Sequence, residues 1–465
     1  MSGWAGRGLA LLVAGTFFME NLDGTIIATA APRMAESFGV PAVSIGAAMT
    51  AYLVTLAVGI PASGKLAARY GTRTIYGAAI VIFTVASALC AASASLPMLI
   101  GMRVLQGVGG AMMVPVGRLA VLRGTTKADL IRAIAYLTWP GLIAPVLAPV
   151  LGGLVTEYAS WRWIFLINLP LGVIAEVCAL RMVPADRDPE VSTVDWWSFQ
   201  LTGLSLAGLV LGAQLLADAS SDWVAVGVAL GVGLGLGGPA VRRLLRAAHP
   251  LMDLRTLRVG TYRVATGGGS WFRAIITAVP FLLPLEFQDV FGWGPIRSGA
   301  VVVAVFAGNI GIKPFTTPLL RRFGFRPVLL GSLAGMIASL VGSGALHAST
   351  PLWVILVVLF FGGVFRSTGF TAYNTIQFAD VAAGDLASAN TLASTTQQLA
   401  AGIGVALGAL ALRAGEPITG GVGAGAYLVA FWILAGCLLI CVAEALGLAP
   451  DAGQQVSRAY SKSDS

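Results

Sequence analysis

The sequence has 465 residues, of which 57% are hydrophobic and 11% are charged, and its formal net charge is +8. A surface that faces water cannot be built from so few charged residues, so nearly all classes of soluble enzyme are excluded. Apolar runs of about 20 residues cross a bilayer as helices, because hydrocarbon offers the backbone no hydrogen-bond partners. The composition therefore predicts a polytopic, all-α membrane protein.

Fourteen apolar segments long enough to span a bilayer follow one another along the chain. We expect membrane helices at 8–28, 42–63, 75–94, 97–117, 132–155, 161–182, 196–217, 223–243, 262–284, 296–317, 327–347, 351–372, 392–412 and 424–446. The first of them carries Glu20 and Asp23 and is too polar for the core of a cleavable signal peptide. We therefore expect it to be a mature helix of a multi-pass plasma (inner) membrane protein.

Basic residues alternate between rich and poor connections along the chain. The connections after odd-numbered segments hold only Arg33, Arg162, Arg297 and Arg413. Those after even-numbered segments hold most of the remaining bases, beginning with Lys65, Arg69, Arg73, Arg118, Arg123, Lys127 and Arg132. Because cations are retained on the cytoplasmic side, both termini are predicted to be cytoplasmic. The positive net charge then requires no nucleic-acid partner, and it favours contact with anionic lipid headgroups.

The chain contains an internal repeat. Residues Leu66–Arg73 recur as Leu319–Arg326, and both copies are expected in short cytoplasmic connections. Two halves of equal orientation imply six spans each, related by an axis along the membrane normal, with spans seven and eight inserted between them. The predicted domains are an amino-terminal bundle (1–183), a linker with the inserted pair (184–258), a carboxy-terminal bundle (259–447) and a cytoplasmic tail (448–465). This architecture suits alternating access, although a fold alone does not define a function.

Four motifs make the chain resemble the major facilitator superfamily, and in particular its fourteen-span drug:H+ antiporter family (EmrB/QacA-like), while runs such as Gly109–Arg118 resemble its MdtD-type subgroup. They are the loop motif at Gly64–Arg73, the first-helix motif at Leu22–Pro32, the fourth-helix motif at Arg103–Gly107 and the sixth-helix entry at Trp161–Pro170. The resemblance implies a secondary transporter with 14 helices. It also implies gating roles for Gly64, Arg69, Gly71 and Arg73.

Two departures from the family pattern bear on gating. Ala68 occupies the place of the acidic residue that is thought to latch the two halves in this family. The fifth-helix antiporter motif is present but weakened at 144–153, where two of its glycines have become alanines while Pro149, Gly152 and Gly153 remain. Pro145 adds a second proline to this segment. The prolines kink the helix, and the glycines permit close helix approach. We interpret this segment as a seal against proton leak between the halves, with simple packing as the alternative.

Charges inside the first and fourth spans are candidates for proton coupling. Glu20 and Asp23 are three residues apart and share one helix face, where repulsion and desolvation favour proton uptake by at least one of them. Arg103 stays charged and must meet a carboxylate, backbone carbonyls or water. Pairing of Arg103 with either acid is expected, and in the family this position tunes the coupling carboxylate. The alternatives are an end cap at Asp23 and a purely structural arginine.

The second half contains two buried bases, Arg273 and Lys313, with few acidic partners. A cavity with surplus positive charge favours an anionic or zwitterionic substrate over a lipophilic cation, unless Lys313 extends toward the cytoplasm. Further candidate residues of the substrate cavity are Asn374, Gln377, Gln398 and Trp139. The polar members of that group could equally link helices to one another.

The sequence therefore predicts a secondary exporter, not an enzyme, that is driven by a proton gradient and ejects a small amphipathic or anionic compound. It contains no P-loop, so ATP is excluded as a cofactor, and its four cysteines form no metal-ligand pattern. A monomer is expected. The alternatives are a metabolite or metal-chelate exporter, a facilitator without proton exchange, and a membrane sensor that does not transport.

Overall fold

The computed structural model describes residues 3–185, 194–217, 222–247, 250–419, 421 and 423–457, and its regular elements in these ranges are helices. Their bounds are α1 Gly3–Phe38, α2 Gly46–Gly59, α3 Ser63–Tyr70, α4 Thr72–Ala91, α5 Leu96–Gly124, α6 Leu130–Tyr158, α7 Trp163–Leu166, α8 Asn168–Met182, α9 Trp196–Ala217, α10 Trp223–Arg246, α11 Gly260–Asp289, α12 Pro295–Gly311, α13 Lys313–Phe323, α14 Phe325–Gly344, α15 Leu352–Ala379, α16 Leu386–Thr419, α17 Ala424–Leu446 and α18 Gln454–Ser457.

Most of these helices are long and apolar enough to cross a bilayer. Twelve helices within the described ranges meet that requirement, and the pair α12–α13, which bends by 48°, makes thirteen if it is one span. Large apolar side chains remain exposed on them, including Leu234 and Trp197. Since such residues gain nothing from water, these faces belong against lipid. The chain is thus a multi-pass membrane protein.

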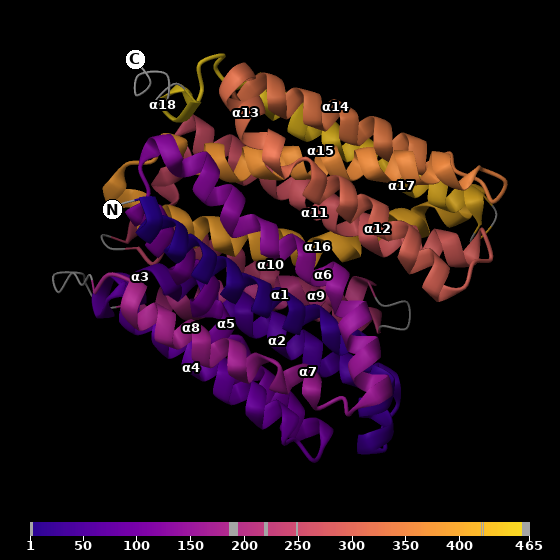
Figure 1. Ribbon diagram of the computed structural model, residues 1–465, viewed down its shortest axis with the longest axis horizontal. Coiled ribbons are helices and arrows are strands. Elements are labelled where there is room, and N and C mark those ends of the chain that lie inside the picture. The colour runs from indigo at the N-terminus through magenta and orange to yellow at the C-terminus, as the bar shows by residue number, and fades with distance from the viewer. Residues whose placement is uncertain are drawn as a thin grey trace.

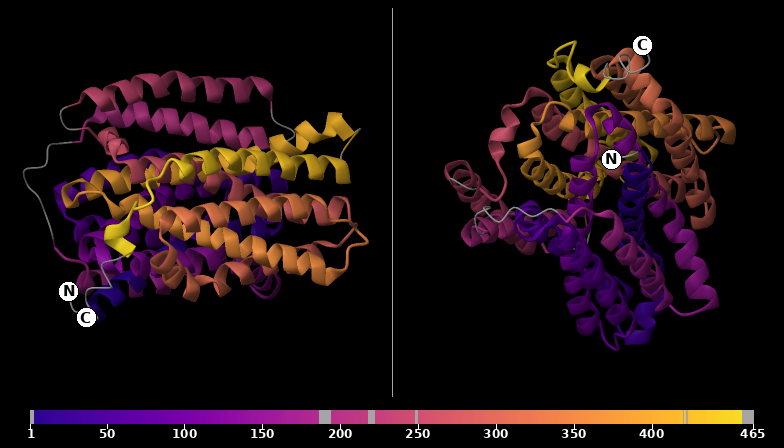
Figure 2. Two further views of the ribbon diagram at one scale, coloured as in Figure 1. Left: turned by 90° about the horizontal axis from the view of Figure 1, so that it is seen from above. Right: turned by 60° about the vertical axis from the view of Figure 1, so that its left-hand side comes forward.

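The helices form two bundles that lie side by side (Figure 1). Helix α1 packs on α6 and α4 packs on α5 in the amino-terminal half, whereas α11 packs on α16 and α14 packs on α17 in the carboxy-terminal half. The hairpin of α9 and α10 lies beside both bundles (Figure 2), with α9 against α2 of one half and α16 of the other. Both described chain ends lie at the same end of the molecule, which we call the terminal end.

The repeat is visible in the backbone. Helices α4 and α14 each have 20 residues, and each follows a glycine with positive φ, Gly71 at 93° and Gly324 at 78°. A side chain is strained in this conformation, which explains the glycine in both copies. The sequence predicted connections here, but residues 66–70 and 319–323 continue the short helices α3 and α13. The polypeptide reverses at the single glycine instead.

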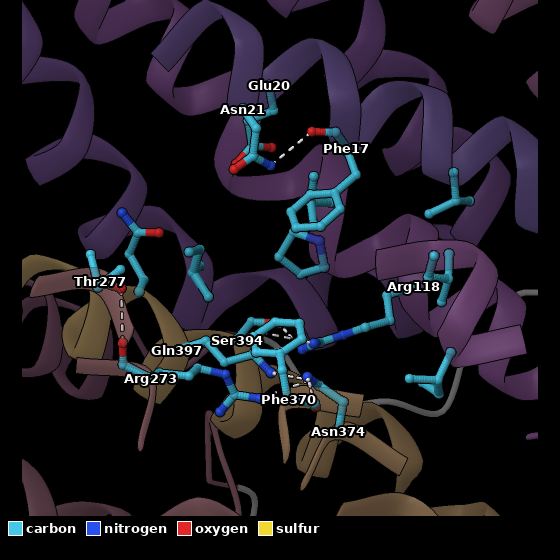
Figure 3. Close-up of a pocket in the computed structure, with 18 of the residues that line it drawn as sticks. Phe17, Glu20, Asn21, Arg118, Arg273, Thr277, Phe370, Asn374, Ser394 and Gln397 are labelled. Carbon is cyan, nitrogen blue, oxygen red and sulfur yellow. Dashed lines mark hydrogen bonds between the residues drawn. The ribbon is translucent and has the colours of Figure 1, made fainter. Parts of the chain in front are cut away.

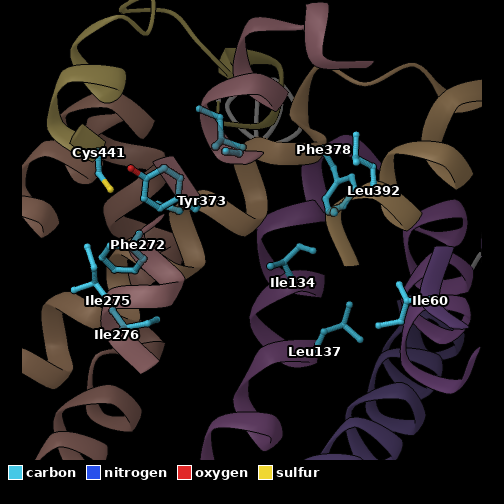
Figure 4. Packing of buried hydrophobic residues seen from close by; sticks show 14 of the residues in the cluster. Ile60, Ile134, Leu137, Phe272, Ile275, Ile276, Tyr373, Phe378, Leu392 and Cys441 are labelled. Carbon is cyan, nitrogen blue, oxygen red and sulfur yellow. The ribbon is translucent and has the colours of Figure 1, made fainter. Parts of the chain in front are cut away.

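Apolar side chains from both halves pack together toward the terminal end. Ile134 and Leu137 of α6 belong to the same buried cluster as Phe378 of α15 and Leu392 of α16 (Figure 4). Ile60, between α2 and α3, joins them. This apolar layer excludes water and closes the space between the halves at that end.

Candidate functional site

A cavity of about 250 Å³ lies between the two halves, and we call it the central cavity. Helices of both bundles supply its walls. Its lining consists of Val13, Phe17, Glu20, Asn21, Ile60, Val114, Pro115, Arg118, Ile134, Leu137, Arg273, Ile276, Thr277, Arg366, Phe370, Asn374, Ser394, Gln397, Gln398 and Ala401. A largely apolar lining with a few convergent polar groups is typical of a site for a small organic molecule.

The charges of the central cavity are unbalanced. Glu20 of α1 is the one acidic residue of its described lining, whereas Arg118, Arg273 and Arg366 contribute three positive charges. Figure 3 shows Glu20 on one wall and Arg273 on the opposite wall. The described lining of the cavity therefore carries a surplus of positive charge.

Two of these arginines retain unused hydrogen-bond donors. Arg273 is 5% exposed, and its Nη2 donates to Asn374 Oδ1 at 2.8 Å. Its Nε and Nη1 have no partner among the described residues, and the same holds for Nε and Nη1 of Arg366. Unsatisfied buried donors on charged groups are costly. These four nitrogen atoms therefore lack the partners that buried donors of charged groups usually have.

A second polar cluster lies within the amino-terminal half, between α1, α4, α5 and α8. Asp23 is 1% exposed and pairs with Arg103 Nη1, as the sequence predicted for one of the two acids. The other oxygen of Asp23 accepts from Gln106 Nε2 at 3.0 Å and from Asn168 Nδ2 at 2.9 Å. The Arg103 guanidinium also lies over the Tyr52 ring, 4.2 Å from its centroid. The pair is thus neutralised and enclosed.

Glu20 and Asp23 have different surroundings although they are one turn apart. Glu20 is half-buried, lines the central cavity, and its Oε2 has no partner among the described residues. Asp23 faces away from that cavity into the enclosed cluster. One acid is therefore available to cavity contents, and the other is held by an arginine. Their roles in proton coupling stay predictions.

Arg118 connects the two halves. Its Nε donates to Asn390 Oδ1 at 2.6 Å, and its other nitrogens donate to Ser394 Oγ at 2.6 Å and Gln397 Oε1 at 3.1 Å. Asn390 in turn donates to the Pro115 carbonyl at 2.7 Å. These bonds fix α5 of one half against α16 of the other on the terminal side of the cavity.

Two further contacts hold the halves together beyond Arg118. Lys127 Nζ donates to the carbonyls of Phe378 and Val381 at 3.1 Å each and to that of Ala379, at the carboxyl end of α15. A cation at this position satisfies carbonyls that have no partner within the helix. Gly64 lies so close to α16 that an added Cβ would be 2.1 Å from Thr391 Oγ1. The cavity is therefore sealed toward the terminal end without the acidic latch that Ala68 replaces.

Several predicted residues lie elsewhere. Lys313 is outside the cavity lining and donates to Thr371 Oγ1 at 2.9 Å, because the bend between α12 and α13 turns it toward α15. Gln377 is buried against α11, where it donates to Thr266 Oγ1 at 3.2 Å. Asn374 and Gln398 do line the cavity. The side chain of Trp139 lies outside the described residues.

The fifth-helix glycines do not form the expected seam between the halves. A Cβ on Gly152 would be 1.9 Å from Thr29 Oγ1, so this glycine permits close packing of α6 on α1 within one half. Gly153 has open space around it. The side chains of Pro145 and Pro149 lie outside the described residues. Of the loop motif, Arg73 donates to the Val183 carbonyl at 2.6 Å and Arg69 lies over the Tyr70 ring, so both act within the amino-terminal half.

The sequence interpretation missed four residues that the structure brings into these sites. Gln106 lies within the fourth-helix motif and Asn168 lies within the sixth-helix entry motif. Their places in these motifs are the signal that could have identified them. Arg118 was assigned to a connection, but α5 continues to Gly124 and places it inside the bundle. Arg366 lies at mid-helix, because α15 extends to Ala379, beyond the end at residue 372 that the sequence predicted for this span.

Comparison with known proteins gives matches along most of the chain. The profile of the Major Facilitator Superfamily matches residues 13–200 and 271–462. MdtD from Escherichia coli O6:H1, whose name refers to multidrug resistance, is 37% identical over 411 residues, which cover 86% of this chain and 85% of that protein. MdtD from Shigella boydii serotype 4 is 37% identical over 416 residues, with the same coverage.

Solved structures show the same fold at low sequence identity. The proton:xylose symporter XylE, bound to 6-bromo-6-deoxy-D-glucose, has a TM-score of 0.69 at 14% identity and covers 99% of this chain and 100% of its own. The human organic anion transporter MFSD10 has a TM-score of 0.63 at 13% identity, with 95% and 97% coverage. At these identities the likeness concerns the fold alone.

Proposed function

Because the chain belongs to the major facilitator superfamily, a family of transporters rather than enzymes, we propose that it is a secondary exporter of small organic anions, driven by exchange with protons. The substrate would carry an anionic group on an apolar body. Multidrug resistance, which the names of the MdtD relatives suggest, would then concern anionic or amphipathic compounds.

The observation that carries this proposal is the charge of the central cavity. Three arginines face one glutamate, and two of the arginines keep unpartnered nitrogen atoms. A lipophilic cation would meet repulsion in this space, whereas a carboxylate or sulfonate would satisfy the free donors. Phe17 and Phe370 supply apolar surface for the remainder of such a molecule.

Proton coupling is assigned to Glu20, Asp23 and Arg103. Glu20 meets the cavity contents, so it can take up a proton once the substrate has left, and Asp23 lies one turn further along α1. A proton that reaches Asp23 would neutralise it and loosen its pair with Arg103. That pair joins α1 to α5, so its state could bias the arrangement of the half.

We further propose fourteen crossings in a six-plus-two-plus-six arrangement, in which the 29-residue α6 is counted with the thirteen spans given above. With both termini cytoplasmic, as the distribution of basic residues predicts, the sealed terminal end is the cytoplasmic end. The structure then represents the state that faces outward. The protein would act as a monomer in the plasma (inner) membrane, without ATP or another cofactor.

A facilitator without proton exchange is the second candidate. It is favoured by the enclosure of Asp23, which pairs with Arg103, accepts from Gln106 and Asn168, and does not line the central cavity. For an anion, the membrane potential alone supplies about 2.3 kcal/mol per 100 mV for each charge, so export needs no coupled ion.

The test is flux in proteoliposomes that contain a trapped pH dye, with 2-naphthalenesulfonate as the anionic probe. The proposal predicts probe-dependent proton movement that is lost in Glu20→Gln, a variant that leaves the Asp23–Arg103 pair intact. Probe flux without proton movement would instead establish the facilitator. Binding of the probe without flux would favour a sensor and contradict the transport proposal.

A further inference from the structure

Glu20 and Arg273 hold corresponding places in the two repeats. The shift in numbering that carries Leu66 onto Leu319 also carries the ends of α4 onto the ends of α14. The same shift carries Glu20 onto Arg273, and α1 and α11 are each the first helix of a repeat. Repeats related by an axis along the membrane normal place corresponding residues at the same depth in the bilayer.

The two residues belong to opposite walls of the central cavity (Figure 3). Each keeps unused hydrogen-bonding atoms, namely Oε2 of Glu20 and both Nε and Nη1 of Arg273. Opposite charges at equal depth, each with unsatisfied atoms, are the components of an ion pair that the open cavity keeps apart.

Other pairings within the cavity fit less well. Arg118 is already occupied by side chains and a carbonyl of α16, on the sealed side. Arg366 comes from α15, which is not the counterpart of α1. Glu20 is the one acid of the described lining, so Arg273 has no other carboxylate within the cavity to meet.

We propose that Glu20 and Arg273 form an ion pair across the cavity when its open end closes without substrate, so that Glu20 and the anionic group of the substrate compete for one guanidinium. Closure removes water from Arg273, and a buried charge without a partner is costly. The cavity therefore closes either on a substrate anion or on Glu20. This inference rests on the proposed alternating access and proton exchange. In the return step Glu20 passes its proton on to Asp23, so that Glu20 is ionised when it meets Arg273.

The pair can be tested without any ligand, by spin-label distances between Glu36→Cys and Gly299→Cys. These exposed positions lie near the open-end termini of α1 and α12, and an added Cβ at Gly299 meets no atom within 4 Å. The labels are placed in full-length protein in lipid nanodiscs, in a background without the four native cysteines. We expect a short-distance population in the parent protein, and a loss of about tenfold in that population in both Glu20→Gln and Arg273→Gln.

Exchange of the two charges, Glu20→Arg with Arg273→Glu, should restore the short-distance population. Arg366→Gln is the matched control, because it removes the same charge from the same cavity and should leave that population unchanged. Three outcomes would each overturn the proposal. They are an equal loss of the short-distance population in Arg366→Gln, an unchanged population in Glu20→Gln and Arg273→Gln, and a parent protein without that population. Thermal unfolding of the two single variants and their double variant, with native cysteines, gives an independent reading, since paired residues lose stability non-additively. None of these readouts depends on transport, so the proposed function is tested separately.

Discussion

The two halves repeat the same arrangement of helices but differ in how their buried arginines are paired. In the amino-terminal half, the Arg103 guanidinium is neutralised by Asp23 within an enclosed cluster. In the carboxy-terminal half, the one hydrogen-bond partner of the Arg273 guanidinium among the described residues is the Asn374 amide, and Arg273 lines the central cavity. The difference indicates that the buried arginine of the first half is paired internally, whereas the buried arginine of the second half is left to meet what the cavity holds.

The largest expected effect follows from breaking the Asp23–Arg103 ion pair of the amino-terminal half. Arg103→Gln leaves the Asp23 carboxylate buried without its counter-charge, which costs about 3–5 kcal/mol. Arg273→Gln, the same substitution in the other half, removes a charge that has no carboxylate partner in this structure, so the folded state should lose less stability than in Arg103→Gln. Thermal unfolding of purified protein in detergent compares the two variants directly.

The double variant Asp23→Asn with Arg103→Gln is the control for that comparison. Because it removes both charges, it should regain most of the stability that Arg103→Gln loses. Equal destabilisation by Arg103→Gln and Arg273→Gln would show that both halves depend on internal charge pairs, contrary to this account.

The next largest effect concerns anion binding by the cavity arginines of the carboxy-terminal half. Arg273→Gln and Arg366→Gln should each weaken 2-naphthalenesulfonate binding by about tenfold or more, because a hydrogen bond to a charged group contributes about 1.5–3 kcal/mol. Asn21→Ala, on the opposite wall, should change the affinity little. Isothermal titration measures all three, and a larger effect at Asn21 than at either arginine would place the anion elsewhere.

The seal between the halves offers a matched pair of glycines. A Cβ at Gly64 would be 2.1 Å from Thr391 Oγ1 and 2.9 Å from the Ala387 carbonyl, so Gly64→Ala must push α3 and α16 apart, at a cost of about 1–3 kcal/mol. Gly153→Ala meets no atom within 4 Å and should be neutral. Labelling of a cysteine at Ser394 by a maleimide from the cytoplasmic side should increase in the first variant only.

The sequence predicted those features of the site that follow from the chemistry of a single residue, and it missed those that depend on where helices end or bend. A charge in hydrocarbon needs a partner, so the pairing of Arg103 with an acid of α1 and the surplus charge at Arg273 followed from the residues alone. The cavity positions of Arg118 and Arg366 did not, because hydropathy places the ends of a span earlier than α5 and α15 actually end. The sequence placed Lys313 in the cavity because it could not reveal the bend after Gly311, which depends on tertiary packing and turns Lys313 toward α15.

The smallest effect belongs to the inserted hairpin, which lies outside both halves. Asp195 binds Arg243 with two bonds of 3.0 and 3.1 Å, and these lower the pKa of Asp195 from 3.8 to about 2. A carboxylate whose pKa is lower in the folded than in the unfolded protein stabilises the fold at pH values above the unfolded-state pKa. The contribution of Asp195 is therefore complete above pH 3.8 and is lost as the pH falls toward 2. Because the pair is partly exposed, Asp195→Asn should cost no more than about 1 kcal/mol at neutral pH. Urea unfolding at pH 7 checks this value, and a loss as large as that of Arg103→Gln would contradict it.

The most direct test of the central claim is the charge preference of the cavity for ligands that share one aromatic body. Thermal stabilisation of the purified protein should be measured with 2-naphthalenesulfonate, 2-naphthalenemethanol and a 2-naphthyl trimethylammonium salt, in the parent protein and in Arg273→Gln. The account predicts that the sulfonate stabilises the parent most and that Arg273→Gln removes this preference. Equal or greater stabilisation by the trimethylammonium ligand would contradict it.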